Sequence, residues 1–356
     1  MARDARGNAP SGLVVVDKPG GMTSHDVVAR IRRLAGTRRV GHAGTLDPMA
    51  TGVLVVGVEK ATRLLGYLTL TDKEYQATIR LGQATDTGDA EGTVLTAGTS
   101  ADPGTSADPG TSGDPGTRAG PAAPLAPAPL APAQLTLAQV QAAAAALTGE
   151  IQQVPPAVSA IKVAGRRSYQ LAREGAPPVL PPRPVTVWSF TVQAVRPAPG
   201  DLLDADVEVR CSSGTYIRAL ARDMGEALGV GGHLTRLRRT RVGPYGLSAA
   251  RTLDELAEQL DVLPLAEAAA AAFPVRELTA EEARSLSHGG RLPGPGPGQD
   301  PGPGQDPGPG GESGSGGESG PGGETGPVAA FGPDGTLIAL VQDKDGVTRP
   351  LAVFVP

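Results

Sequence analysis

The stretch GHAGTLDPMATG, residues Gly41 to Gly52, places one carboxylate among small and apolar side chains. Asp47 lies between Leu46 and Pro48, and glycines such as Gly44 permit a tight, irregular backbone that can approach a ligand closely. A solvated acid does not need these surroundings, and a helix cap would be followed by a helical pattern rather than by Pro-Met-Ala-Thr-Gly. Two interpretations stay open for these twelve residues: a reactive carboxylate, or a turn aspartate that hydrogen-bonds its own backbone.

Apolar strands and amphipathic helices are expected on both sides of this stretch. Apolar runs and strict alternation predict strands in LVVVDKP, GVLVVGV, EYQATIRLGQAT, PVTVWSFTV and DVEVRC. Ser24 and Thr136 are predicted to cap helices, a third helix is predicted to open at Tyr216, and capping-box patterns start at Thr252 and Thr279. This mixture predicts an α+β fold, with a mixed, mostly antiparallel sheet flanked by helices.

The last part of the chain has a different pattern. The segment VAAFGPDGTLIALVQDKDGVTRPLAVFVP predicts three short strands joined by Pro-Asp-Gly and Lys-Asp-Gly turns. We therefore expect a flexible N-terminus at residues 1–12, a main domain at 13–270 and a small β-domain at 271–356. Gly- and Pro-rich blocks at about 97–133 and 293–327 repeat six-residue units without large apolar residues, which predicts disordered insertions.

The insertions also distort the charge of the 356-residue chain, which is −5 overall. The first block holds three aspartates and one arginine, and the second holds two aspartates and three glutamates, so the remaining chain is weakly basic. Cys211 is the only cysteine, which excludes an internal disulfide and favours an intracellular, cytoplasmic protein. Its strand-like surroundings predict a core residue rather than a nucleophile. No apolar run is long enough for a transmembrane helix, so no membrane partner is expected.

Arginines are concentrated in two short runs, RIRRLAGTRR and HLTRLRRTR. Dense positive charge of this kind suits a phosphate backbone, although a solvated helix face is the simpler alternative for either run alone. Two runs in a chain with acidic insertions favour a polyanionic partner.

Three further side chains are candidates for a site. Tyr216 and Arg218 lie where the strand before GTYIRALARDMGEALG passes into a helix, and such junctions often present side chains into a cleft. An arginine there can hold a carboxylate ionised, although a surface arginine is the alternative. Tyr75 shares a strand face with apolar residues, so ordinary core packing is its alternative.

Taken together, these features resemble those of the TruB family of tRNA pseudouridine synthases. The resemblance covers nearly all of residues 13–245 outside the first insertion, and it rests on long motifs that occur in order: LVVVDKPGGMTSHDVV, VGHAGTLDPMATGVLVVGVEKATRL, DKEYQATIRLGQATDTGDAEG, QQVPPAVSAIKVAGRRSYQLAREG, CSSGTYIRALARDMGEALG and HLTRLRRTRVG. The tail resembles, more weakly, the short RNA-binding β-domain of PUA type found at that position in the family.

The resemblance implies a specific activity. The family isomerises the uridine at position 55 in the tRNA T-loop to pseudouridine without a metal or nucleotide cofactor, after the base is flipped out of the loop. Asp47 matches the catalytic aspartate, Arg218 the arginine that favours its ionised form, and Tyr75 the tyrosine that stacks on the uracil and helps to remove the C5 proton.

Five more residues are expected to contact the substrate by the same resemblance. Tyr216 matches a second active-site tyrosine, Leu237 an apolar residue against the flipped base, and His42 a histidine among the extruded loop bases. Arg63 stands where the family often has lysine and is expected to bind phosphate. Arg239, in the second arginine run, is also expected to bind substrate.

One position departs from the family pattern. Val158 stands where an aromatic residue is usual in the loop that clamps the tRNA, which removes a stacking surface.

Rival functions remain open. An RNA-binding protein or tRNA-folding chaperone, alone or in addition to catalysis, is one rival, and a guide-RNA-dependent relative is another. A glycosidase would need a second carboxylate near Asp47. We expect a monomer that acts on tRNA without guide RNA, cofactor or metal.

Overall fold

The structure, a computed structural model of the chain, describes residues 10–95, 131–294 and 326–355, with short gaps between residues 160 and 177. The chain forms two compact units. One consists of Met1–Thr71 together with Arg239–Pro356, and the other of Asp72–Arg238. The expected boundary between residues 270 and 271 lies within the first of these units.

The predicted insertions and the predicted flexible N-terminus lie largely outside the described residues, so their disorder stays a prediction. Ordered elements approach the undescribed ranges closely. Strand β1 begins at Gly12, the last residue of the predicted N-terminal segment. The short helix η2 (Pro132–Gln134) overlaps the predicted end of the first insertion, and strand β16 (Leu292–Pro293) overlaps the predicted start of the second.

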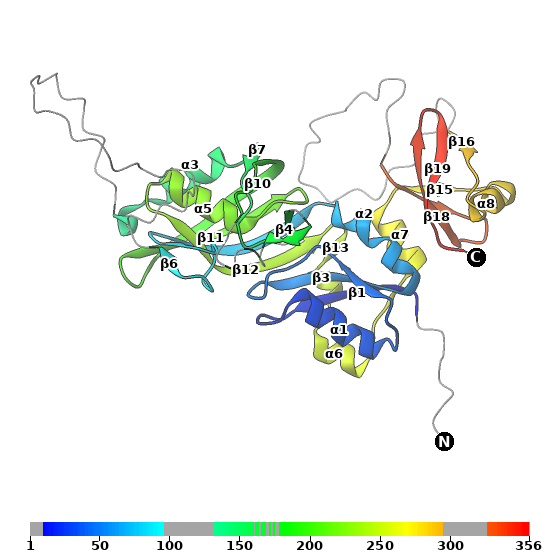
Figure 1. The fold of residues 1–356 in the computed structure, drawn as a ribbon, viewed down its shortest axis with the longest axis horizontal. Coiled ribbons are helices and arrows are strands. Elements are labelled where there is room, and N and C mark those ends of the chain that lie inside the picture. Colours follow the sequence, from blue (N-terminus) through cyan, green and yellow to red (C-terminus); the bar gives the residue numbers. More distant parts are fainter. Residues whose placement is uncertain are drawn as a thin grey trace, which may run out of the picture. The chain divides into compact units, whose positions relative to one another are not determined.

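In the first unit, strands pair in the order β14-β1-β3-β12, with β2 paired to β3 and β13 to β12. Antiparallel pairing of β1 with β3 runs from Gly12 opposite Val58 to Lys18 opposite Gly52. Helices α1 and α6 of this unit lie side by side (Figure 1). The bounds of its first elements are β1 Gly12–Lys18, α1 Ser24–Leu34, β2 Val40–Ala43, β3 Thr51–Val58, η1 Glu59–Arg63 and α2 Leu65–Thr69. The later ones are β12 Gly232–Val242, whose first residues belong to the second unit, β13 Tyr245–Gly246, η3 Leu247–Ala249, α6 Leu253–Glu258, β14 Leu263–Pro264 and α7 Leu265–Ala272.

The predicted N-cap of the first helix, Ser24, is one residue late. Thr23 is the N-cap: its hydroxyl accepts from the Asp26 N–H, and the Asp26 carboxylate accepts from the Thr23 N–H, which completes a capping box. Ser24 is therefore the first residue of α1, and its hydroxyl serves another contact described below. The predicted N-caps Thr136, Thr252 and Thr279 are confirmed.

The C-terminal part of the first unit is a five-stranded sheet in the order β15-β17-β18-β19-β16, with one helix. Asp345 and Gly346 both have positive φ in the turn between β18 and β19, as the predicted Lys-Asp-Gly hairpin requires. The three predicted strands are confirmed. Bounds here are β15 Val275–Glu277, α8 Ala280–Ser287, β16 Leu292–Pro293, β17 Val328–Phe331, β18 Leu337–Lys344 and β19 Val347–Val353.

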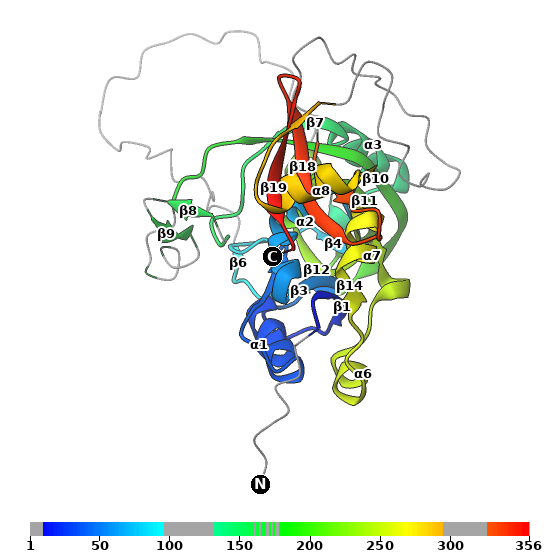
Figure 2. The same cartoon turned by 90° about the vertical axis from the view of Figure 1, so that its right-hand side faces the viewer.

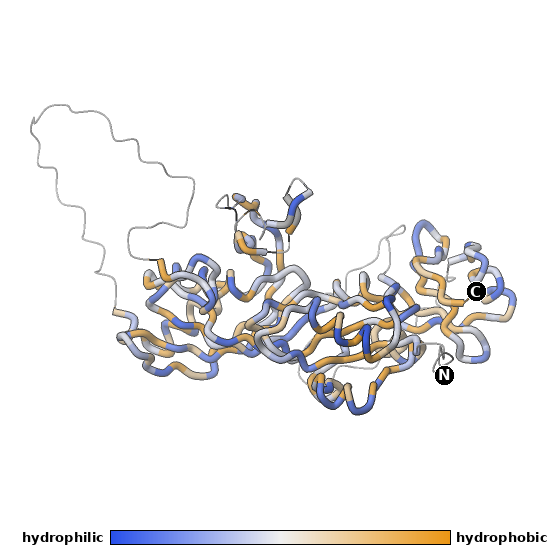
Figure 3. The backbone as a smooth tube through the Cα atoms, turned by 60° about the horizontal axis from the view of Figure 1, so that its bottom comes forward, coloured by the Kyte–Doolittle hydropathy of each residue, from blue (hydrophilic) through white to orange (hydrophobic). Residues whose placement is uncertain are grey.

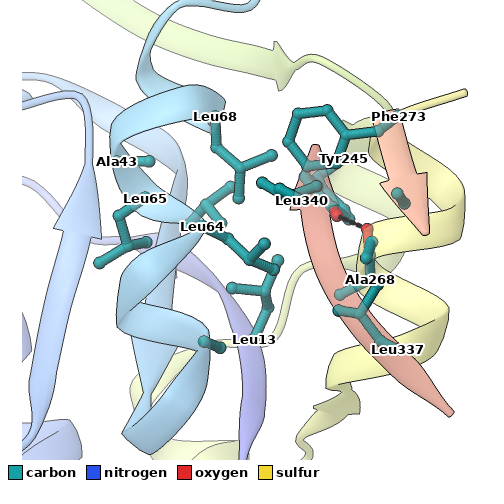
Figure 4. Packing of buried hydrophobic residues seen from close by; sticks show 14 of the residues in the cluster. Leu13, Ala43, Leu64, Leu65, Leu68, Tyr245, Ala268, Phe273, Leu337 and Leu340 are labelled. Atoms are coloured by element: carbon teal, nitrogen blue, oxygen red, sulfur yellow. Dashed lines mark hydrogen bonds between the residues drawn. The ribbon is translucent and has the colours of Figure 1, made fainter. Parts of the chain in front are cut away.

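One hydrophobic core joins the two parts of the first unit. Leu13 of β1 and Leu64 and Leu68 near α2 belong to the same buried cluster as Phe273 and Leu340. Figure 4 shows these side chains meeting between α2, β1 and β18, with the Tyr245 hydroxyl donating to the Ala268 carbonyl at 2.7 Å. The C-terminal strands are thus part of the core that supports β1 and β3.

In the second unit, strands pair in the order β12-β4-β11-β10-β7. Helix α3 packs on β10 and against α5 (Figure 1), and the segment with β8 and β9 extends away from β7 and β10 (Figure 2). Bounds here are β4 Lys73–Leu81, β5 Ala84–Thr85, β6 Val94–Leu95, α3 Leu137–Ala146, β7 Gly149–Gln153, β8 Lys162–Val163, β9 Arg166–Arg167, β10 Arg183–Ala198, β11 Leu202–Cys211 and α5 Ile217–Ala227.

The alternation predicted for β4 is confirmed. Tyr75, Ala77, Ile79 and Leu81 are buried on one face. On the other face, Thr78 and Arg80 bind carboxylates of β11, which gives that side of the sheet its polar character. Hydrophobic and hydrophilic stretches alternate along the described chain, as one-sided burial requires (Figure 3). The predicted α+β class with a mostly antiparallel sheet is confirmed. No helix within the described ranges has the length and apolar character needed to cross a membrane.

Candidate active site

The loop that carries Asp47 connects β2 to β3 in the first unit. Asp47 is half-buried between Leu46 and Pro48, and its carbonyl accepts from the Ala50 N–H at 3.1 Å. Leu46 and Ala50 are buried on either side of it, so the apolar setting read from the sequence is present. The loop begins with Gly44 at a φ of +81°, a conformation that suits glycine.

Ser24 holds the residue before Asp47. Its hydroxyl, 1% exposed, accepts from the Leu46 N–H at 2.9 Å and donates to the Leu46 carbonyl at 3.1 Å. A side chain that bonds the N–H and the carbonyl of one residue fixes the peptide groups on both sides of that residue. The first turn of α1 is therefore tied to the backbone next to the carboxylate.

Lys18 holds the residue after Asp47. The side chain is fully buried, and its Nζ donates to the carbonyls of Pro19 at 2.8 Å, Met22 at 2.7 Å and Pro48 at 3.1 Å. The Gly21 N–H donates to the same Pro48 carbonyl at 2.9 Å. A buried ammonium group needs this density of oxygen partners to offset its lost hydration. Sequence reasoning missed Lys18, although a lysine that ends an apolar strand was visible in LVVVDKP.

Arg239 supports the same loop from β12. The side chain is 1% exposed, with Nε donating to the Val53 carbonyl at 2.8 Å and Nη2 to the Gly44 carbonyl at 3.0 Å. A Cβ at Gly52, which has a φ of +98°, would lie 2.2 Å from the Arg239 carbonyl oxygen, so only glycine allows this approach. Arg239 thus bonds the backbone at both ends of the loop that carries Asp47.

His42 lies in β2, a few residues before Asp47. Its ring meets the ring of His25 edge to face, with centroids 5.6 Å apart and an interplanar angle of 86°. Burial, with smaller contributions from His25 and Arg239, lowers the pKa of His42 to about 4. Its Nδ1 is buried and makes no hydrogen bond to the described residues. The imidazole is therefore neutral near pH 7.

Arg63, the remaining candidate in the first unit, ends the short helix η1. Its Nη1 donates to the carbonyl of Val353 in β19. This contact links the β3–α2 connection to the C-terminal sheet, and the predicted phosphate contact stays a prediction.

The second unit carries the other four candidates. Tyr75 in β4 is 7% exposed and faces the apolar side of the sheet, opposite Val209 of β11. Tyr216 is the N-cap of α5 and is half-buried. Leu237 in β12 is 5% exposed. Tyr216 thus begins the helix as predicted.

Arg218 lies in the first turn of α5 and is 4% exposed. Nη1 donates to the Thr87 carbonyl at 2.9 Å, and Nη2 donates to the Val158 carbonyl at 2.9 Å. The guanidinium also lies 3.7 Å from a carboxylate oxygen of Asp89, which is itself buried. A buried arginine with carbonyl and carboxylate partners keeps a fixed direction.

Asp89 is a residue that sequence reasoning passed over, although it lies in the quoted motif DTGDAEG. Its carboxylate accepts from the Thr87 hydroxyl at 2.6 Å and from the Glu91 N–H at 3.1 Å. These contacts shape a turn that brings both Asp89 and the Thr87 carbonyl to Arg218. Only spatial proximity, which the sequence does not give, identifies it as a partner of Arg218.

Two other expectations concern Cys211 and metal ions. Cys211 is fully buried, and burial raises the pKa of its thiol to about 11, so it is a core residue as predicted. Within the described part of the chain, no three His, Cys, Asp or Glu side chains gather as metal ligands would. The expectation that no metal or cofactor is needed stays a prediction.

Comparison with known proteins gives consistent matches along the chain. The model of the "TruB family pseudouridylate synthase (N terminal domain)" matches residues 32–108 and 128–217. Residues 218–267 match "tRNA pseudouridylate synthase B C-terminal domain", and residues 318–355 match "tRNA Pseudouridine synthase II, C terminal".

Full-length relatives agree with these matches. The chain is 52% identical over 348 residues to tRNA pseudouridine synthase B of Arthrobacter sp. (strain FB24), which covers 97% of either chain. It is also 52% identical to the enzyme of the same name from Thermobifida fusca (strain YX), over 96% of this chain and 98% of that one.

Among solved structures, the fold resembles a chain in the crystal structure of the archaeal box H/ACA sRNP Nop10-Cbf5 complex. The TM-score is 0.62 at 22% identity, covering 98% of this chain and 87% of that chain. At this identity the likeness concerns the fold alone. The sequence matches decide the family: the chain belongs to the TruB family of pseudouridylate synthases.

Proposed function

We propose that the chain isomerises uridine 55 in the T-loop of tRNA to pseudouridine. The observation that carries the proposal is the loop of Asp47, in which the backbone of Leu46, Pro48 and Gly44 is held by the buried side chains of Ser24, Lys18 and Arg239. A nucleophile needs such a fixed backbone, because its reach to the sugar or base must be reproducible to a fraction of an ångström.

The reaction needs no external group for its balance. The bond between N1 and C1′ breaks, the uracil turns, and C5 bonds to C1′ while C5 loses its proton and N1 gains one. Asp47 is the nucleophile or the group that assists elimination, and Tyr75 stacks on the uracil and helps to transfer the C5 proton. Arg218 supplies positive charge that favours the ionised aspartate.

The remaining candidates divide into two roles. His42, Tyr216 and Leu237 are proposed to contact the extruded bases, for which neutral or apolar side chains are suitable. Arg63 is proposed to bind phosphate. For Arg239, the buried contacts with Val53 and Gly44 support a role in holding the loop rather than in touching RNA.

The substrate partner is proposed to be tRNA itself, bound by a monomer in the cytoplasm without guide RNA. Four arginines of α1 and its exit are exposed and suit the phosphates of a stem: Arg32, Arg33, Arg38 and Arg39. An additional role in tRNA folding is favoured by the need to open the loop before reaction, since the open tRNA must refold afterwards.

The test is release of tritium from a tRNA transcript labelled at uridine C5, with purified protein and no added metal or RNA. Wild-type protein is expected to release one label per tRNA with many turnovers, and Asp47→Asn none. Asp254→Asn, which changes an exposed carboxylate of α6, is the control and should retain activity. Tight tRNA binding without release would instead favour a binding or folding protein. Release only with added guide RNA would favour the guided branch.

A further inference from the structure

Gln153, the last residue of β7, is a buried polar side chain that the reaction scheme does not use. It is 1% exposed, whereas the side chain of the preceding Gln152 is exposed. β7 is the last strand in the order of its sheet and pairs with β10, where Gln153 lies opposite Arg183. Burying an uncharged amide costs free energy unless its N–H group and its carbonyl are both hydrogen-bonded.

Both halves of the Gln153 amide bind the backbone of one residue, Tyr216. The Tyr216 N–H donates to Oε1 at 2.8 Å, and Nε2 donates to the Tyr216 carbonyl at 3.2 Å. This is the pattern by which one strand pairs with another, made here by a side chain. Tyr216 is the N-cap of α5, and its carbonyl also accepts from the N–H groups of Ala219 at 3.1 Å and Leu220 at 3.2 Å within the helix. The N–H of an N-cap residue takes no part in the helical ladder, and here it binds Gln153.

The segment that follows Gln153 contacts α5 at two more points. Arg222 Nη2 donates to the Val154 carbonyl at 3.0 Å, and Arg218 Nη2 donates to the Val158 carbonyl at 2.9 Å. Residues 153–158 are therefore attached at three points along α5 and its N-cap: through the side chain of Gln153 and through the carbonyls of Val154 and Val158. The contact at Val158 uses its carbonyl, so it does not depend on the side chain that differs from the family pattern.

We propose that Gln153 is a positioning residue, which fixes the first turn of α5 and thereby the directions of Tyr216 and Arg218. The positioning role rests on the proposed function only because that function assigns roles in the reaction to Tyr216 and Arg218. Glutamine meets the requirement because it is uncharged and carries an N–H donor group and a carbonyl acceptor on a single planar amide. Methionine has a similar length but neither bond, and glutamate would place a charged acceptor against the Tyr216 carbonyl.

The test compares Gln153→Met and Gln153→Glu with Gln152→Met, the matched change at the exposed neighbour. For both changes at residue 153, kcat for tritium release should fall by about tenfold to a hundredfold, while KM for tRNA stays within about twofold. The control variant should match wild type in both constants. A role limited to stability would lower the melting temperature and leave the kcat of the folded enzyme intact.

A second readout does not depend on the reaction. In the free protein, hydrogen exchange of peptides within residues 212–222 should accelerate in both variants at residue 153, while peptides from β4 keep wild-type protection. Unchanged kcat or unchanged exchange in that region overturns the proposal. If Gln153→Met does not fold, Gln153→Glu decides by the same two criteria. Should wild-type protein release no tritium, the proposed function fails, and the exchange result alone still supports or overturns the positioning role.

Discussion

The buried ammonium of Lys18 donates to the carbonyl of Pro48, the residue directly after Asp47, at 3.1 Å. Through the Pro19 and Met22 carbonyls the same group also closes the turn between β1 and α1. Lys18 therefore joins the turn before α1 to the loop of the proposed nucleophile. Ser24, in the first turn of α1, fixes the peptide on the other side of Asp47.

Lys18→Met should destabilise the fold and disturb the Asp47 loop. The change removes the three hydrogen bonds from the buried ammonium to the Pro19, Met22 and Pro48 carbonyls, and a hydrogen bond to a charged group contributes about 1.5–3 kcal/mol. We expect a loss of about 3 kcal/mol or more in the free energy of unfolding in urea, together with a fall in kcat. Lys60→Met, at an exposed lysine of η1, is the control. Wild-type stability in Lys18→Met would show that the three contacts contribute little.

Asp89→Asn should affect both stability and turnover through Arg218. Both side chains are about one-twentieth exposed, at 5% and 6%. Removing one charge of a buried pair typically costs about 3–5 kcal/mol because the other charge remains buried. We expect this loss in urea unfolding, and a kcat reduced by about tenfold. Asp86→Asn, at an exposed acid in the same turn, is the control.

A double-mutant cycle tests whether the effect passes through Arg218. If Asp89 acts by orienting the guanidinium, the change should cost much less in a background of Arg218→Met. Additive losses in the double variant would mean that Asp89 acts through the turn at Thr87 alone.

The pKa of His42 predicts a pH-dependent stability. The folded value is lowered from 6.5 to about 4, so below about pH 6.5 the unfolded chain binds a proton that the folded protein does not. The free energy of unfolding therefore decreases as pH falls from about 6.5 to about 4, by at most about 1.4 kcal/mol per pH unit, and the contribution is constant above that window.

His42→Asn removes this titration and should make the free energy of unfolding depend less on pH. Urea unfolding between about pH 7 and pH 5 is expected to show a smaller loss for the variant than for wild type. His288→Asn, at an exposed histidine that ends α8, should keep the wild-type slope. Equal slopes for wild type and His42→Asn would contradict the neutral, buried imidazole.

The sequence was sufficient for elements whose signals are local. Alternation in β4 and the hairpin at Asp345 and Gly346 follow from residue type and spacing, and both are present. The N-cap prediction for Ser24 was wrong because two adjacent hydroxyl residues compete, and the capping box with Asp26 selects Thr23. The hydroxyl of Ser24 binds Leu46, 22 residues away, and a contact at that separation leaves no local pattern.

The same reason explains what was missed around the candidate site. Lys18, Asp89 and Gln153 each contact a residue that is distant in sequence, respectively Pro48, Arg218 and Tyr216. None belongs to a motif whose spacing reveals its partner. Arg239 was expected to bind substrate because it lies in a basic run, but its neighbours in that run do not show that its own guanidinium is buried on Val53 and Gly44.

The shared core of the first unit predicts that the C-terminal strands stabilise the part that carries Asp47. Leu340 of β18 is fully buried in the same cluster as Leu13 and Leu64. Leu340→Ala should cost about 2–5 kcal/mol in unfolding free energy. Hydrogen exchange should accelerate in peptides of β1 and β3 as well as in β18, because one core supports all three. Leu70→Ala, at a residue 69% exposed, is the control. Loss of protection confined to residues 275–353 would mean that the C-terminal sheet unfolds on its own, as an independent domain would.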